Sequence, residues 1–262
     1  QALTALDNAI DRAAQAYQSD GRLSGLATGL KDLDAKMGGL QPTDLIIIAG
    51  RPGMGKTSLA TNIAFNVASA YDATEQVDGS PRPVAGGIVA FFSLEMSSEQ
   101  LATRVLSEQA EVPSSSIRRG DIGETDFGRL LDCRQKMRRL PLFIDQTGAL
   151  SIAQVAARAR RLKRQRGLHL IVVDYIQLMQ GRSQRATQNR VQEITEITTG
   201  LKALAKELNV PVIALSQLNR SLETRTDKRP VMADLRESVQ AAIEVTVRAA
   251  DVEIAHALAV VG

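Results

Sequence analysis

Short apolar runs alternate with amphipathic segments along most of the chain after Gly25. Five runs predict strands, at residues 44–50, 88–96, 140–147, 168–179 and 210–217. Because these runs are almost continuously apolar, they are typical of strands buried on both faces of a parallel sheet. The order predicts an α/β fold with a mostly parallel central sheet and helices on both faces.

The segments between the runs predict helices at residues 57–71, 97–110, 151–167 and 188–209. Ser97 is placed as a cap, and Ser151 with Gln154 forms a capping-box pattern. Gly167 is placed to end the helix that Ser151 begins. Residues 72–87 contain two prolines and three glycines, and they predict a mobile loop.

The first 17 residues form a separate amphipathic pattern. Leu3, Leu6 and Ile10 recur at helical spacing, and Asp20 and Gly21 break the pattern. We expect residues 1–20 to be a linker helix that docks on its own or on a neighbouring subunit, and residues 21–262 to be one large domain. The first residue is not Met, which suggests a fragment or a processed chain.

Composition gives only limited information about the binding partners of the chain. The net charge is +3, from 32 basic and 29 acidic residues, and aromatic residues make up 3%. Few aromatic rings favour nucleic-acid contacts through phosphates rather than base stacking. The single cysteine, Cys133, predicts a reducing compartment and a small buried residue. No apolar run approaches the roughly 20 residues of a membrane span, so no membrane partner is expected.

A phosphate-binding loop follows the first predicted strand. Gly50 is separated by four residues from Gly55, Lys56 and Thr57, in the strand–loop–helix context that this pattern requires. Glycines let backbone N–H groups face phosphates, and the helix N-terminus adds its positive end. The lysine is placed to reach the terminal phosphates and the threonine hydroxyl to bind Mg²⁺.

Three polar residues end other predicted strands. Asp174 is placed as a second Mg²⁺ anchor. Glu95 can orient or deprotonate an attacking water, although an acid that stabilises a helix N-terminus is the alternative. Gln217 can hydrogen-bond a γ-phosphate. The loops at 181–190 and 218–230 are basic, and they predict a polyanion groove or simply a solvated surface.

Five segments, in this order, resemble the C-terminal RecA-like motor domain of DnaB-type replicative helicases. They are LSGLATGLKDLDAKMGGLQPTDLIIIAGRPGMGKTSLATNIAFNVA, FFSLEMSSEQLATRVLSE, LIVVDYIQLM, QNRVQEITEITTGLKALAKELNVPVIALSQLNR and DKRPVMADLRES. The resemblance runs from about Leu23 to Ser238. It implies a RecA-like P-loop ATPase that moves on single-stranded DNA as a homo-oligomer, with a hexameric ring as the expected form. It also implies a bacterial cytoplasmic location at the replication fork, and primase and a helicase loader as candidate partners.

The resemblance also implies residue roles, with ATP and Mg²⁺ as cofactors. The catalytic residues would be Glu95, Gln217 and Lys56. The nucleotide contacts would be Gly50, Arg51, Gly53, Met54, Gly55, Lys56, Thr57, Ser58 and Arg104. Thr57 and Asp174 would serve the metal. The DNA contacts would be Arg236, Glu237, Ser238 and Arg220.

After Ser238 the sequence departs from the family pattern and lacks its Lys-x-Arg pair, which leaves Arg248 as a weak candidate for a residue that acts on a neighbour's site. Ile243, Val245 and Val247 alternate with polar residues and still predict strands. Two alternatives remain: another RecA-fold ATPase, of the recombinase or clock type, and an ATP-binding assembly scaffold without catalysis.

Overall fold

The computed structural model describes residue 10 and residues 23–50, 52–75, 81–180, 190–217, 243–249 and 252–261. Its helices are α2 (Lys31–Met37), α3 (Lys56–Ser69), α4 (Ser98–Ala110), α5 (Ser114–Arg119), α6 (Glu124–Met137), α7 (Ile152–Arg166), α8 (Arg190–Leu208) and the 3₁₀ turn η1 (Ile176–Leu178). Its strands are β1 (Leu45–Gly50), β2 (Asp72–Glu75), β3 (Pro81–Ala85), β4 (Val89–Ser93), β5 (Leu142–Asp145), β6 (Leu170–Asp174), β7 (Val212–Gln217), β8 (Ile243–Ala249) and β9 (Val252–Val261).

One sheet organises the described residues, in the strand order β5-β4-β6-β7-β1-β9-β8. The five strands from β5 to β1 are parallel, and they are the five that the apolar runs predict. β9 pairs antiparallel with β1, and β8 pairs antiparallel with β9. The strand expected around residues 243–247 is therefore confirmed as β8.

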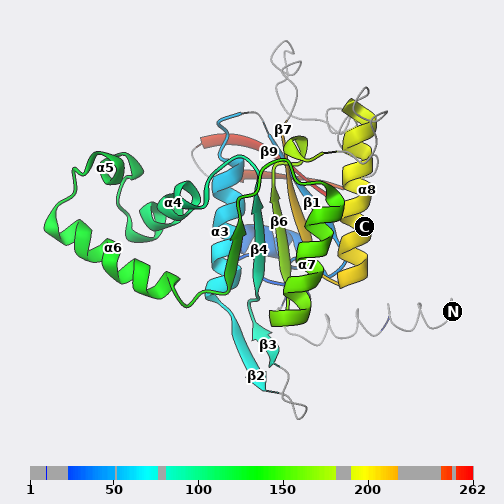
Figure 1. Ribbon diagram of the computed structural model, residues 1–262, viewed down its shortest axis with the longest axis horizontal. Coiled ribbons are helices and arrows are strands. Elements are labelled where there is room, and N and C mark those ends of the chain that lie inside the picture. Colours follow the sequence, from blue (N-terminus) through cyan, green and yellow to red (C-terminus); the bar gives the residue numbers. More distant parts are fainter. Residues whose placement is uncertain are drawn as a thin grey trace.

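Alternate residues of the same strands supply two separate cores. On one face, residues such as Ile47 and Val173 pack with α7 and α8. On the other face, residues such as Ile48 and Val172 pack with α2, α3 and Leu101 of α4. Figure 1 shows α7 and α8 lying in front of the sheet, with α3 beside its other face and α4–α6 extending away from it. The predicted α/β fold with helices on both faces is confirmed.

Local signals for helix ends proved accurate where side chains could satisfy backbone groups. Ser97 and Ser151 each form a complete capping box, with Gln100 and Gln154 respectively. Gly167 follows the last residue of α7 as expected. Cys133 is buried in a small cluster formed by α4–α6.

The loop prediction for residues 72–87 is wrong at residues 72–75 and 81–85. β2 and β3 form an antiparallel hairpin there, with Glu75 paired to Pro81. Prolines cannot donate a ladder hydrogen bond, but a two-stranded ribbon has free edges on both sides, where Pro81 and Pro83 are tolerated. The prolines and glycines of the segment predict a loop, because composition cannot show that these residues lie at the free edges of a two-stranded ribbon.

The predicted linker helix at residues 1–20 lies outside the described residues except for Ile10, which is exposed. Within the described part of the chain, none of the helices combines the length and apolar character needed to cross a membrane.

Candidate functional site

The loop between β1 and α3 adopts a conformation that favours glycine. Gly53 and Gly55 have φ angles of 75° and 82°, in the left-handed region. A Cβ at either position would meet nothing within 4 Å, so the backbone conformation rather than lack of space requires glycine. Gly55 is also the N-cap residue of α3, where no side chain bonds the first N–H groups. Those groups and the positive helix end can therefore receive an anion.

Lys56 begins α3 and is buried. Its Nζ donates a hydrogen bond to the carbonyl oxygen of Gly50 at 2.8 Å. Burial lowers the pKa of Lys56 below its ordinary value, and the charges of Asp174 and Glu95 act in the opposite direction. The ammonium group thus lies beside the Gly50 carbonyl in a poorly solvated position, where a phosphate would gain a strong charge-assisted interaction.

Asp174 is the last residue of β6, and it is almost fully buried. Burial raises its pKa to about 6, although a hydrogen bond with Thr57 and the charge of Arg104 act to lower it. Its Oδ2 atom is buried without a hydrogen-bond partner among the described residues. A buried carboxylate oxygen left unpaired is costly, and it would be satisfied by a cation or by a water bound to one. Together with the Thr57 hydroxyl it offers the oxygen ligands that Mg²⁺ prefers, so these residues fit the expected metal.

Glu95 lies in a tight turn after β4. The strand ends at Ser93, three residues earlier than the apolar run predicts. The buried Ser93 hydroxyl donates to the carbonyl oxygen of Met96 at 2.8 Å, and the Leu94 N–H donates to the carbonyl oxygen of Asp174 at 2.8 Å. These bonds leave Glu95 itself exposed. The turn therefore presents a carboxylate at the edge of the site, next to the strand that carries Asp174.

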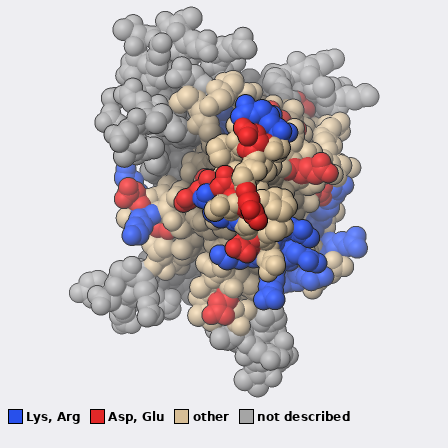
Figure 2. Space-filling model, turned by 90° about the vertical axis from the view of Figure 1, so that its left-hand side faces the viewer, with Lys and Arg blue, Asp and Glu red and all other residues tan. Residues whose placement is uncertain are grey.

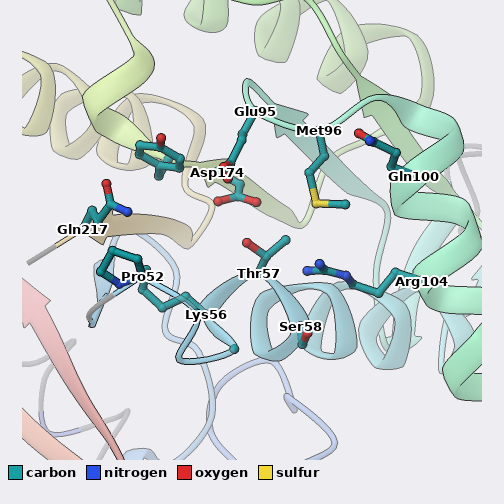
Figure 3. Close-up of a pocket in the computed structure, with 13 residues that line it drawn as sticks. Pro52, Lys56, Thr57, Ser58, Glu95, Met96, Gln100, Arg104, Asp174 and Gln217 are labelled. Atoms are coloured by element: carbon teal, nitrogen blue, oxygen red, sulfur yellow. The ribbon is translucent and has the colours of Figure 1, made fainter. Parts of the chain in front are cut away.

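A cavity of about 580 Å³ joins these groups. Its lining residues are Pro52, Gly53, Gly55, Lys56, Thr57, Ser58, Glu95, Met96, Gln100, Arg104, Asp174, Tyr175 and Gln217. Figure 3 shows Asp174 between Glu95 and Thr57, Arg104 extending from α4 toward Thr57, and Gln217 on the opposite side. The cavity places cations, two carboxylates and two amides around one space, at the carboxyl ends of parallel strands where ligands of such sheets bind.

Most of the predicted nucleotide residues meet in this cavity, and a few do not. Gly50 is buried at the end of β1, and Met54 is half-buried but does not line the cavity. Five predicted residues lie outside the described residues: Arg51, Arg220, Arg236, Glu237 and Ser238. The basic loops also lie there, apart from Arg190 at the start of α8.

Sequence reasoning missed four lining residues: Pro52, Met96, Gln100 and Tyr175. Each is adjacent in sequence to a predicted site residue or lies on α4 one turn before Arg104. Proximity to the motifs was therefore the available signal. Only the folded arrangement shows that these particular neighbours face the cavity.

Several basic side chains of α7 have partners in neighbouring elements of the described residues. Arg160 forms two hydrogen bonds with Glu207 of α8, at 2.6 and 2.7 Å. Arg158 pairs with Asp145 of β5. His169 is likewise a structural residue, because its Nδ1 accepts the Ile88 N–H at 3.0 Å. Figure 2 shows the face that carries α4–α6, where acidic and basic groups intermingle over the centre and positive groups gather near one lower edge.

Comparison with known proteins places the chain in a family. The model of the DnaB-like helicase C terminal domain matches residues 25–252. The replicative DNA helicase DnaB of Rickettsia conorii is 50% identical over 224 residues, which cover 86% of this chain and 44% of that protein. The replicative DNA helicase DnaB of Geobacillus stearothermophilus is 43% identical over 228 residues, which cover 87% of this chain and 47% of that protein. The chain thus spans less than half the length of these curated relatives.

Solved structures agree with the sequence match. One, described as an ATPase domain, is 30% identical with a TM-score of 0.78, and the match covers 93% of this chain and 83% of that one. Another, described as a DnaB-like replicative helicase and its interactions with primase, is 29% identical with a TM-score of 0.76, and the match covers 92% of this chain and 56% of that one. The expected RecA-like fold is confirmed. The chain belongs to the DnaB-like helicase C-terminal domain family.

Proposed function

We propose that this chain is the ATP-hydrolysing motor of a replicative DNA helicase, which moves along single-stranded DNA and separates duplex strands at a replication fork. The observation that carries the proposal is the cavity in which Lys56, Asp174, Glu95 and Gln217 converge from different elements of the sheet. A scaffold that only bound nucleotide would need the positive charge of Lys56, but it would not need the carboxylate of Glu95 and the amide of Gln217 near the terminal phosphate.

Binding of ATP would use the loop and the start of α3. The N–H groups that follow Gly55 and the ammonium group of Lys56 would hold the β- and γ-phosphates. The Thr57 hydroxyl and Asp174 would hold Mg²⁺, Asp174 directly or through a water. When bound, this ion would neutralise charge on the phosphate oxygens. Arg104, whose charge already acts on Asp174, would face the same phosphates from α4.

Hydrolysis would proceed by in-line attack of a water on the γ-phosphorus. Glu95 would orient that water and accept its proton as the new oxygen–phosphorus bond forms and the bond to ADP breaks. Gln217 would hydrogen-bond the γ-phosphate from the end of β7. Loss of this contact after hydrolysis would change the position of the segment that begins at residue 218. We propose that this segment, with Arg220, Arg236, Glu237 and Ser238, contacts the DNA backbone.

The working unit would be a ring of six copies, in the bacterial cytoplasm. The linker helix proposed for residues 1–20 would dock on a neighbouring copy. A similar helicase structure is described together with its interactions with primase, which supports primase as a partner. A helicase loader is a further candidate on the family resemblance alone.

The test is ATP hydrolysis by the purified chain, with and without single-stranded DNA. We expect measurable hydrolysis that DNA stimulates, and its loss in Lys56→Ala. Lys31→Ala is the matched control, because Lys31 is an exposed lysine at the start of another helix and does not line the cavity. Hydrolysis without any response to DNA would contradict the translocation role. Absence of hydrolysis with retained ATP binding would favour a scaffold.

A second measurement addresses the ring. Native mass, measured with and without ATP, would be expected to show a closed assembly of several copies. A strictly monomeric chain under all conditions would contradict the ring, although it would leave the nucleotide site unaffected.

A further inference from the structure

Among the described strands, the end of β7 has a neighbour on one side only. Its pairing with β1 continues to the last residue, where Gln217 is opposite Gly50. Its pairing with β6 stops at Ala214, opposite Val173. After Asp174 the chain leaves the sheet and forms η1, so β6 cannot bond the last residues of β7.

One side chain occupies the place of the missing strand. The Gln177 Nε2 donates to the Ser216 hydroxyl at 2.9 Å and to the Gln217 carbonyl oxygen at 3.1 Å. In return, the Gln217 N–H donates to Gln177 Oε1 at 3.2 Å. A primary amide has both a donor and an acceptor, so a single glutamine can satisfy both backbone groups of one residue, as a neighbouring strand would.

Gln177 is carried by a well-anchored turn. Its neighbour Ile176 is 0% exposed and Met179 is 2% exposed, both within the core on the α7–α8 face. The Gln180 N–H donates to the carbonyl oxygen of Leu150 at 3.1 Å, which ties the turn to the residues before α7. The amide of Gln177 is therefore supported by packing on one side while it binds the end of β7 on the other.

This contact links two parts of the site. Gln177 follows Asp174 by three residues, so the same short segment carries the carboxylate and holds the backbone of Gln217. The side chains of Asp174 and Gln217 both line the cavity. A strand end with pairing on one side only would otherwise be able to open locally, and the direction of the Gln217 side chain would then be poorly defined.

We propose that Gln177 is a positioning residue for hydrolysis, which fixes the backbone of Gln217 so that its amide is directed at the γ-phosphate. The inference rests on the proposed function, in which Gln217 contacts that phosphate. Gln177 itself does not line the cavity, and it acts only through its neighbour. The binding of ATP, which the loop and Lys56 provide, does not depend on it.

The experiment is a double-mutant cycle on ATP hydrolysis. Gln177→Leu removes the amide at similar size, Gln217→Ala removes the proposed sensor, and the third variant combines them. We expect Gln177→Leu to lower kcat about tenfold, the scale of one or two lost hydrogen bonds. The KM for ATP should change less than about twofold, because positioning acts on the transition state. In the Gln217→Ala background, Gln177→Leu should change kcat by less than about twofold.

Gln180→Leu is the matched control, because Gln180 is an exposed glutamine beside the same turn. It should leave kcat unchanged. Thermal melts of all variants set an assay temperature at which each is folded, so a loss of kcat reports on the site. Multiplicative effects of the two substitutions on kcat, or an unchanged kcat in Gln177→Leu, would overturn the inference about Gln177. The proposed function would still stand if the wild-type chain hydrolysed ATP. A wild-type chain without ATPase activity would overturn both.

Discussion

The most direct test of the chemical proposal is Glu95→Gln, which removes one negative charge and changes little else in size. Glu95 is exposed to the cavity at the tip of its turn, and the bonds that hold this turn involve Ser93 and the backbone rather than the Glu95 side chain. An exposed substitution of this kind changes the free energy of unfolding by roughly 0.5 kcal/mol or less. Folding should therefore survive the change.

The effect on catalysis should be much larger. A positioned general base contributes about 10²- to 10⁴-fold in rate. This corresponds to about 3–5 kcal/mol in the activation free energy, at about 1.4 kcal/mol for each tenfold. ATP binding should not weaken. Burial is the main cause of the raised pKa of Asp174, and the charge of Glu95 acts in the same direction, so Glu95 adds negative potential where a polyphosphate would bind.

The assay is steady-state ATP hydrolysis with a separate measurement of nucleotide affinity. Glu95→Gln should lower kcat by at least about a hundredfold, with unchanged or tighter ATP binding. Glu99→Gln is the control, because Glu99 is also exposed and lies in the first turn of α4 but does not line the cavity. If Glu95→Gln retained hydrolysis within about threefold of wild type, Glu95 would be only an acid near a helix N-terminus. The base would then have to be sought elsewhere.

Three further outcomes are expected. Thr57→Val should abolish Mg²⁺-dependent hydrolysis, whereas Thr57→Ser should retain it within a few-fold of the wild-type rate. The measurement is the rate of hydrolysis in a Mg²⁺ titration, and equal loss in both variants would mean that the hydroxyl is not the group required. Gly86→Ala should lower the free energy of unfolding, measured by urea denaturation, by about 3 kcal/mol, because the φ of Gly86 is 60° and the new Cβ would lie 2.4 Å from backbone atoms. Gly128→Ala is the control and should stabilise slightly, because Gly128 lies within α6 and a Cβ there would meet no atom within 4 Å. Burial acts to raise the pKa of Asp145, but the hydrogen bond with Arg158 contributes to a pKa below the ordinary 3.8, so the ionised group stabilises the fold above that pH and this stability is lost on acidification. Asp145→Asn should lower the free energy of unfolding by at most about 1 kcal/mol at neutral pH and make stability depend less on pH in the acid range. An unchanged pH dependence in the acid range would exclude the Asp145–Arg158 pair as its source.

The parts of the fold that were predictable depend on local rules. The five apolar runs became the five parallel strands because burial on both faces leaves little freedom in composition. The capping boxes at Ser97 and Ser151 were predictable because all of their bonds lie within three residues. The β2–β3 hairpin was not predictable from composition. Prolines are acceptable there only because β2 pairs with β3, and these strands are separated in the sequence by several residues.

The same distinction applies to the site. Lys56, Thr57 and Asp174 could be placed by sequence because each occupies a fixed point relative to a strand end. Gln177 could not be recognised in this way, since its role arises where the β6–β7 ladder stops and a side chain takes over the pairing. The length of a strand ladder is a tertiary property, and the apolar run over 168–179 overestimated β6 by several residues for this reason.

The order of the strands explains why these distant residues can act as one unit. β4, β6, β7 and β1 are consecutive in the sheet, and they or the segments that directly follow them supply Glu95, Asp174, Gln217 and the loop that ends at Lys56. Adjacent strands are about 4.8 Å apart, so four strand ends span about 14 Å, comparable to a triphosphate with its metal and attacking water. A change at the terminal phosphate would therefore first affect the two middle strands. Those are the strands whose ends Gln177 connects, and the proposed DNA-binding segment begins immediately after the second of them. In the proposed mechanism, the coupling of hydrolysis to movement would thus require no long pathway through the domain, only a change in how the end of β7 is held.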